Sequence, residues 1–178
     1  MSALRVRYSG HVLLTRVSDE ISILPGRAED VPTILALIKG LAEYERLADH
    51  VVATEEDLMR SLFGDRPAAE VVIAWTAGQA VGFALFFHNF STFLARPGLY
   101  LEDLFVKPEW RGRGVGRRLL SHLAGIALER GCGRFEWAVL DWNESAIAFY
   151  RRMGAVVLDD WRVCRVTGEA LDTLASLR

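Results

Sequence analysis

A run of three glycines set between arginines constrains this chain more than any other feature. The segment reads VKPEWRGRGVGRRLL and spans 106–120. Leu99–Val106 has the composition of a strand, whereas Gly116–Arg130 places its apolar residues at helical spacing and is followed by the stop residue Gly131. A glycine-rich loop between a strand and a helix predicts a sheet covered by helices.

The glycine loop is suited to binding phosphate groups. Gly112, Gly114 and Gly116 carry no Cβ, so the backbone can approach a ligand closely. The first N–H groups of the following helix lack helical partners, and the helix dipole adds partial positive charge there. Five basic side chains and one acidic side chain lie in the segment: Lys107, Arg111, Arg113, Arg117, Arg118 and Glu109.

This basic island belongs to a chain whose net charge is −2, so the rest of the chain is acidic. The pattern predicts one anionic ligand at one place and argues against nucleic acid, which needs an extended basic surface. Two common phosphate motifs do not fit. The loop lacks the Gly-Lys-Ser/Thr ending of a P-loop, and Arg117 stands where a Rossmann fingerprint requires its third glycine. The plain alternative is a glycine turn with solvated arginines.

Length and composition predict one domain and no membrane span. The chain has 178 residues, half of them apolar, and no apolar run approaches the ~20 residues of a spanning helix. The N-terminus lacks the features of a secretion signal. Cys132 and Cys164 lack metal-ligand spacing, and no two histidines stand at helical spacing. We therefore expect free thiols in the cytoplasm and no metal site.

The remaining periodicity predicts a mixed, mostly antiparallel α/β sheet with helices on both faces. Residues 1–20 are expected to form an extension before a single domain at 21–178. Helices are expected at 30–47, 54–63, 145–153 and 169–177. Strands are expected at 21–24, 70–76, 80–88, 134–140, 156–158 and 161–166.

The loop also carries a resemblance to a known family. Val106-x-Pro108-x-x-Arg111-Gly112-x-Gly114-x-Gly116 is similar to the acyl-CoA loop of the GNAT superfamily of N-acetyltransferases. In that family, loop amides hold the pyrophosphate of coenzyme A, and the preceding strand splays from its neighbour to pair with the pantetheine arm. The resemblance implies the GNAT fold, acetyl-CoA as co-substrate, and these contacts: Leu104, Phe105, Val106, Arg111, Gly112, Arg113, Gly114, Val115, Gly116, Arg117 and Asn143.

Three further segments resemble the spermidine/spermine N-acetyltransferase branch, which includes diamine and thialysine acetyltransferases: LIKGLAEYE, YLEDLFV and WNESAIAFYRRMGA. The resemblance covers about 21–174 and implies a homodimer that acetylates a small amine. Ala36 and Glu43 stand where polyamine-specific relatives are expected to carry basic residues. The segment between Gly154 and Trp161 is also shorter than in those relatives. The choice among polyamine, small diamine and thialysine-like acceptors therefore stays open.

Two residues are predicted to be catalytic. Tyr150 shares a helical face with apolar residues, which by itself fits a core tyrosine; the resemblance implies a general acid for the departing thiolate. Glu102 and Asp103 interrupt an apolar strand, and alternation sends them to opposite faces, where salt bridges would suffice to explain them. The resemblance implies that Glu102 accepts the ammonium proton through water. Transfer would be direct, with an N–H near Val106 stabilising the oxyanion, because neither cysteine has an evident base partner.

The resemblance also implies a set of contacts to the acceptor: Tyr44, Glu45, Glu102, Asp103, Glu136 and Trp161. For each carboxylate, the alternative is a solvated surface charge. Two other functions remain open from the residues alone. One keeps the CoA site but acetylates a protein, a peptide or an aminoglycoside. The other is a non-catalytic acyl-CoA sensor, against which the presence of both Tyr150 and Glu102 argues.

Overall fold

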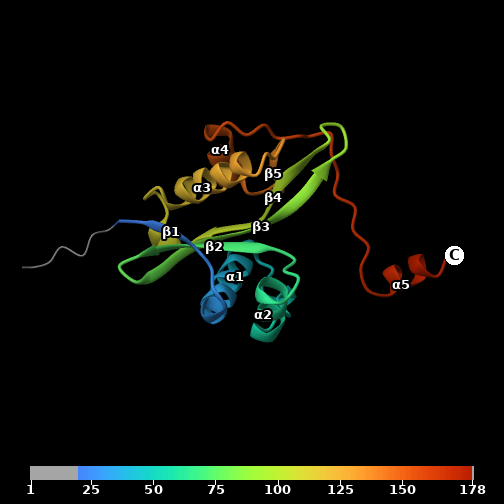
Figure 1. Cartoon of the computed structure of the whole chain (residues 1–178), viewed down its shortest axis with the longest axis horizontal. Coiled ribbons are helices and arrows are strands. Elements are labelled where there is room, and N and C mark those ends of the chain that lie inside the picture. Colours follow the sequence, from blue (N-terminus) through green and yellow to red (C-terminus); the bar gives the residue numbers. More distant parts are fainter. Residues whose placement is uncertain (1–19, 178) are drawn as a thin grey trace, which may run out of the picture. The chain divides into compact units, whose positions relative to one another are not determined.

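A computed structural model describes residues 20–177, which form two compact units that divide after Ala138 (Figure 1). The extension expected at 1–20 lies outside the described residues except for Glu20, so that boundary stays a prediction. No helix in the described range has both the length and the apolar character needed to span a membrane.

The first unit contains a five-stranded sheet in the order β1-β2-β3-β4-β5. Strands β1 to β4 are antiparallel to their neighbours, and β5 runs parallel to β4. The predicted mixed, mostly antiparallel sheet is therefore confirmed. The strands are β1 (Ser22–Pro25), β2 (Glu70–Thr76), β3 (Gln79–Ser91), β4 (Arg96–Val106) and β5 (Phe135–Trp137).

Helices cover both faces of this sheet, as predicted. α1 (Val31–Glu45) and α2 (Glu55–Phe63) lie on one face, and α3 (Val115–Glu129) lies on the other (Figure 1). Three 3-10 turns connect them: η1 (Ala28–Asp30), η2 (Ala48–His50) and η3 (Pro108–Trp110). The sequence spacing Thr54-x-x-Asp57 is that of a capping box, and in the structure the two residues cap the start of α2 reciprocally.

The core under α1 and α2 anchors the last part of β4. Ile34 and Leu37 of α1 pack with Ile73, Phe83 and Phe105 of the sheet. Burying such side chains contributes about 1.5–3 kcal/mol each, which holds β4 firmly below α1. On the other face, the apolar side of α3 is buried except at Leu128, which is 81% exposed although its spacing placed it near that side.

The second unit contains α4 (Glu144–Arg152) and α5 (Glu169–Ala175). The side-chain oxygen of Asn143 accepts the N–H of Ala146 at 3.2 Å and so caps α4. The strands predicted at 156–158 and 161–166 are wrong: within 139–177 the structure forms no strand. Their apolar residues are exposed except for the half-buried Val157, and their backbone forms no ladder. A β pattern without a partner strand does not make a sheet.

Candidate active site

The glycine loop adopts a backbone that only glycine favours at two positions. Gly112 has φ 74° and Gly114 has φ 84°, in the left-handed region, and Gly114 is the N-cap of α3. A Cβ at either glycine would meet no protein atom within 4 Å. The outer face of the loop is therefore open, and the unpaired N–H groups of the first turn of α3 can donate hydrogen bonds to an anion.

Two of the predicted cofactor contacts are available through their backbone alone. Val115 is 1% exposed and Phe105 is 5% exposed, because both side chains pack into the core. The other predicted positions on β4, Leu104 and Val106, are half-buried. The loop thus presents mainly peptide groups, as a pyrophosphate site on a helix N-terminus requires.

The arginines of the loop have different partners. The Nε of Arg111 donates to the carbonyl of Val106 at 3.0 Å, and its guanidinium lies 4.1 Å from the centroid of the Tyr44 ring. This cation–π contact ties the loop to the end of α1. Arg113 lies over Trp110, whereas Arg118 donates to the carbonyl of Ile21 at 3.2 Å and so fastens β1. Arg113 and Arg117 are exposed on the loop, where an anion can reach them.

The edge of β4 toward β5 is paired over only part of its length. β5 pairs with Leu99–Leu101, whereas β4 continues to Val106. Among residues 20–138, the backbone of 102–106 on this edge has no strand partner. An unpaired strand edge can bind an extended amide chain by adding it as a strand.

A β-bulge lies at Glu102. Asp103 pairs with Leu85 and Leu101 pairs with Phe86, so Glu102 is the extra residue between two consecutive positions of β3. The bulge interrupts the alternation that predicted opposite faces for Glu102 and Asp103. Bulges redirect side chains and are frequent beside active sites. Glu102 is exposed, and Asp103 beside it is half-buried.

Carboxylates from α1 and β4 gather around this bulge. Burial, together with the charges of Glu102 and Glu45, raises the pKa of Asp103 to about 6. Burial also raises the pKa of Glu45. The predicted acceptor contacts Glu45, Glu102 and Asp103 are therefore brought together, and a protonated amine would relieve their mutual repulsion.

Glu136 lies next to this group but already has partners. It pairs in register with Tyr100, and its charge and that of Glu102 add to burial in raising the pKa of the Tyr100 hydroxyl. The Nε of Arg134 lies 2.8 Å from its carboxylate, and the amide of Asn89 donates to it at 3.3 Å. Sequence reasoning missed Arg134, although two residues of a strand spaced by two share a face.

The remaining predicted residues belong to the second unit. Tyr150 is 9% exposed, with its ring 5.4 Å from that of Phe149, and Asn143 is buried at the start of α4. Trp161, predicted to contact the acceptor, is exposed. The roles of these three residues stay predictions.

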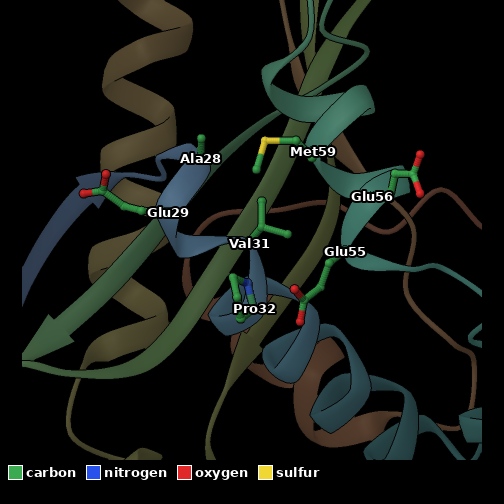
Figure 2. A pocket seen from close by; sticks show the side chains of 7 residues that line it. All are labelled: Ala28, Glu29, Val31, Pro32, Glu55, Glu56 and Met59. Atoms are coloured by element: carbon green, nitrogen blue, oxygen red, sulfur yellow. The ribbon is translucent and has the colours of Figure 1, made fainter.

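Two hollows open on the first unit. The larger, of about 800 Å³, lies between α1, the β2–β3 turn and the start of the glycine loop, and Tyr44 and Phe105 line it. The smaller, of about 420 Å³, lies where η1 and α1 meet α2 (Figure 2). Its surface is apolar at Val31, Pro32 and Met59 and acidic at its edges, and none of the predicted site residues line it.

Replacing Gly114 by alanine tests the loop. We expect the KM for acetyl-CoA to rise about tenfold, because a left-handed alanine costs about 1–2 kcal/mol and the loop would relax away from its binding geometry. Gly125→Ala is the matched control, since it lies inside α3 with no atom within 4 Å of the added Cβ. Titration calorimetry with CoA checks both variants, and equal CoA affinity in the two would contradict the assignment.

Comparison with known protein sequences identifies a family and several relatives. Residues 38–155 match the acetyltransferase (GNAT) family. A thialysine N-epsilon-acetyltransferase of Sus scrofa is 39% identical over 166 residues, covering 87% of this chain and 97% of the relative. An L-ornithine N5-acetyltransferase of Arabidopsis thaliana is 36% identical over 193 residues, covering 83% of this chain and 85% of the relative.

Solved structures show the same fold. An integron cassette protein from the mobile metagenome of V. cholerae superposes with a TM-score of 0.75 at 28% identity, covering 88% of this chain and 98% of the other. An aminoglycoside acetyltransferase from an uncultured soil metagenomic sample has a TM-score of 0.72 at 18% identity, covering 85% of this chain and 98% of the other.

Proposed function

The chain belongs to the GNAT family and is an N-acetyltransferase, and from this premise we propose that it acetylates the terminal amine of a thialysine-like amino acid or a small diamine. The acceptor class is supported by the names of its relatives, which act on thialysine and on L-ornithine. The observation that carries the proposal is that the carboxylates of Glu45, Glu102 and Asp103 gather at the bulge of β4, the strand that leads into the glycine loop.

Acetyl-CoA would be held by peptide groups and exposed arginines of the first unit. The N–H groups at the start of α3 and the side chains of Arg113 and Arg117 would hold the phosphates. The pantetheine arm would extend the unpaired edge of β4 beside Leu104 and Val106. Asn143 would add a further contact to acetyl-CoA. The thioester supplies the electrophilic carbonyl carbon.

The acceptor amine arrives as an ammonium ion and has to lose a proton before it can attack. Glu45 and Asp103 would bind the cation, and Glu102 at the bulge would accept the proton through water. The neutral nitrogen then attacks the thioester carbon, and a backbone N–H near Val106 stabilises the oxyanion.

Collapse of the tetrahedral intermediate breaks the carbon–sulfur bond. Tyr150 would donate its proton to the departing thiolate, so that CoA leaves as the thiol, and the positively charged nitrogen of the new amide would lose its extra proton through water, which restores Tyr150. No covalent enzyme intermediate is required. Trp161 would contact the rest of the acceptor.

We also propose a cytoplasmic homodimer. Exposed apolar residues of the second unit, Val156, Leu158, Trp161 and Val163, support an interface there, because a partner chain would remove their surface from water. Light scattering after size-exclusion chromatography tests the dimer; a monomer at all concentrations would contradict it.

The function is tested by CoA release from acetyl-CoA with purified protein. The panel contains ornithine, lysine, thialysine, putrescine, cadaverine, spermidine, an aminoglycoside and a lysine-bearing peptide. Turnover with small amines alone is expected. Turnover only with the peptide or the aminoglycoside would overturn the acceptor class. Acetyl-CoA binding without any turnover would indicate an acyl-CoA sensor.

A further inference from the structure

The carboxylates at the bulge explain how an ammonium group binds but do not choose among amines. Ornithine and putrescine both present a terminal ammonium on a short alkyl chain. They differ in that ornithine carries an α-carboxylate beside its α-ammonium. Selection between them requires a second polar group at a distance from Glu102 and Asp103.

Glu136 on β5 and Arg134 just before this strand supply such a group. The Nε of Arg134 lies 2.8 Å from the carboxylate of Glu136, and the two side chains are 37% and 34% exposed. Glu136 stands beside Tyr100 in the β4–β5 register, on the side of the bulge away from the glycine loop. An ion pair of opposite charges at this place is complementary to a zwitterion.

The packing of Arg134 turns the end of its side chain outward. A Cβ at Gly98 would lie 2.2 Å from the Oδ1 of Asn89 and 3.1 Å from the Cγ of Arg134, so the arginine lies directly over the bare glycine backbone. Its Nε is buried. The exposed part of the side chain is therefore its Nη end, and the Nη groups have no partner among residues 20–177.

This polar group is incomplete within the described part of the chain. The Nε of Arg134 and the Oδ1 of Asn89 are both buried without a hydrogen bond. The Nε of Arg134 lies near a Glu136 oxygen, but its N–H is not directed at that oxygen. Buried polar atoms without partners are uncommon and indicate a place where another group completes the network. A ligand that reorients the guanidinium would allow such completion.

The spacing fits an amino acid laid along β4. Tyr100 marks the Arg134–Glu136 end and Asp103 marks the ammonium end. Because Glu102 is the extra residue of the bulge, Tyr100 and Asp103 pair with Phe87 and Leu85, which are two residues and therefore ~7 Å apart along β3. The charges of Glu102 and Glu136 both act on the Tyr100 hydroxyl, so both carboxylates lie near this end. The distance is close to the length of an extended basic side chain from its α-carbon to its terminal nitrogen.

We infer that Arg134 and Glu136 bind the α-carboxylate and the α-ammonium of a basic amino acid, and so direct the enzyme to amino acids rather than to diamines or polyamines. The inference rests on the proposed function. The Nη groups of Arg134 take the carboxylate in the bidentate geometry that a guanidinium favours. Glu136 takes the α-ammonium, and the terminal ammonium reaches Glu102 and Asp103.

Two matched substrate pairs test the inference: ornithine with putrescine, and lysine with cadaverine. The members of each pair differ by the carboxylate alone. Wild-type kcat/KM is expected to favour the amino acid of each pair. Arg134→Gln is expected to lower this preference roughly 10- to 100-fold, since a hydrogen bond to a charged group contributes about 1.5–3 kcal/mol. Arg134→Lys should retain part of it.

Controls separate recognition from folding. Arg96→Gln removes another exposed arginine of the first unit and should leave the preference unchanged. Ornithine methyl ester, which lacks the carboxylate charge, should be a poor substrate for the wild type and should discriminate little between wild type and Arg134→Gln. Equal loss on ornithine and putrescine in Arg134→Gln would assign Arg134 a structural role and overturn the inference.

A binding measurement keeps this test independent of the proposed function. Calorimetric titration of ornithine and of putrescine into the protein–CoA complex should show the same preference and the same loss in Arg134→Gln. If the wild-type protein binds or acetylates putrescine better than ornithine, the inference is overturned and the proposed function is unaffected. Absence of turnover with every small amine overturns the proposed function, whereas selective ornithine binding would still support the role of Arg134.

Discussion

Phenylalanine in place of Tyr150 is expected to lower kcat by roughly 100-fold and to leave the KM for acetyl-CoA unchanged. A general acid typically contributes about 10²–10⁴, and a thiolate is a good leaving group, so the lower part of this range applies. The aromatic ring remains in place at a position that is 9% exposed, so helix α4 should keep its packing. Single-turnover kinetics with a saturating amine measures the chemical step.

The neighbouring substitution Phe149→Leu serves as the control. It changes packing on the same helix and leaves the hydroxyl of Tyr150 intact. We expect its kcat to remain near that of the wild type. If both variants lose kcat equally, the effect comes from the packing of α4, and if Tyr150→Phe retains full kcat, proton donation by this tyrosine is ruled out.

Asparagine in place of Asp103 should remove an ionisation from the pH profile. Because the pKa of Asp103 is raised to about 6, wild-type kcat/KM for the amine should rise as pH increases through about 6, where the carboxylate becomes charged and binds the ammonium. The variant should lack this rise and have a roughly 10- to 100-fold lower kcat/KM at about pH 8. Initial rates across the pH range, with saturating acetyl-CoA, check both.

Asp103→Asn is expected to lower kcat/KM but to raise the stability of the folded protein at high pH. The pKa of Asp103 lies above its ordinary value of 3.8, so the folded protein binds this proton more tightly than the unfolded chain does. The group therefore destabilises the wild type above about pH 6, and the penalty fades as pH falls toward 4. Asp103→Asn should be the more stable protein at about pH 8 and lose its advantage at about pH 4, as urea denaturation would show.

Glu102→Gln distinguishes the two carboxylates of the bulge. If Glu102 accepts the proton, its loss lowers kcat, whereas loss of Asp103 raises mainly the KM for the amine. An effect of Glu102→Gln on KM alone would transfer the base role to Asp103. Both substitutions keep the size of the side chain, so they leave the β4 register largely undisturbed.

Local spacing predicted the parts of the site that depend on neighbours in the chain. The glycine pattern located the loop in which Gly112 and Gly114 adopt left-handed backbone, and the Thr54–Asp57 spacing located a cap that the structure forms. Alternation failed at Glu102, because the bulge depends on the register between β3 and β4. The strands expected at 156–166 failed for a related reason: apolar composition indicates that a segment can pair, but only a partner strand makes it do so.

The sequence by itself determined the family, the glycine loop between a strand and a helix, and the strand that carries Glu102 and Asp103, because these features lie within a few consecutive residues. Only the tertiary structure decided that Glu45 approaches Asp103, that Arg111 lies over Tyr44, and that Arg134 crosses Gly98 to reach Glu136. Each of these contacts joins different elements or side chains across a sheet. The burial and the pKa of a side chain at such a place depend on its distances to other side chains. Strand pairing and helix packing set these distances, and they cannot be derived from residue spacing along the chain.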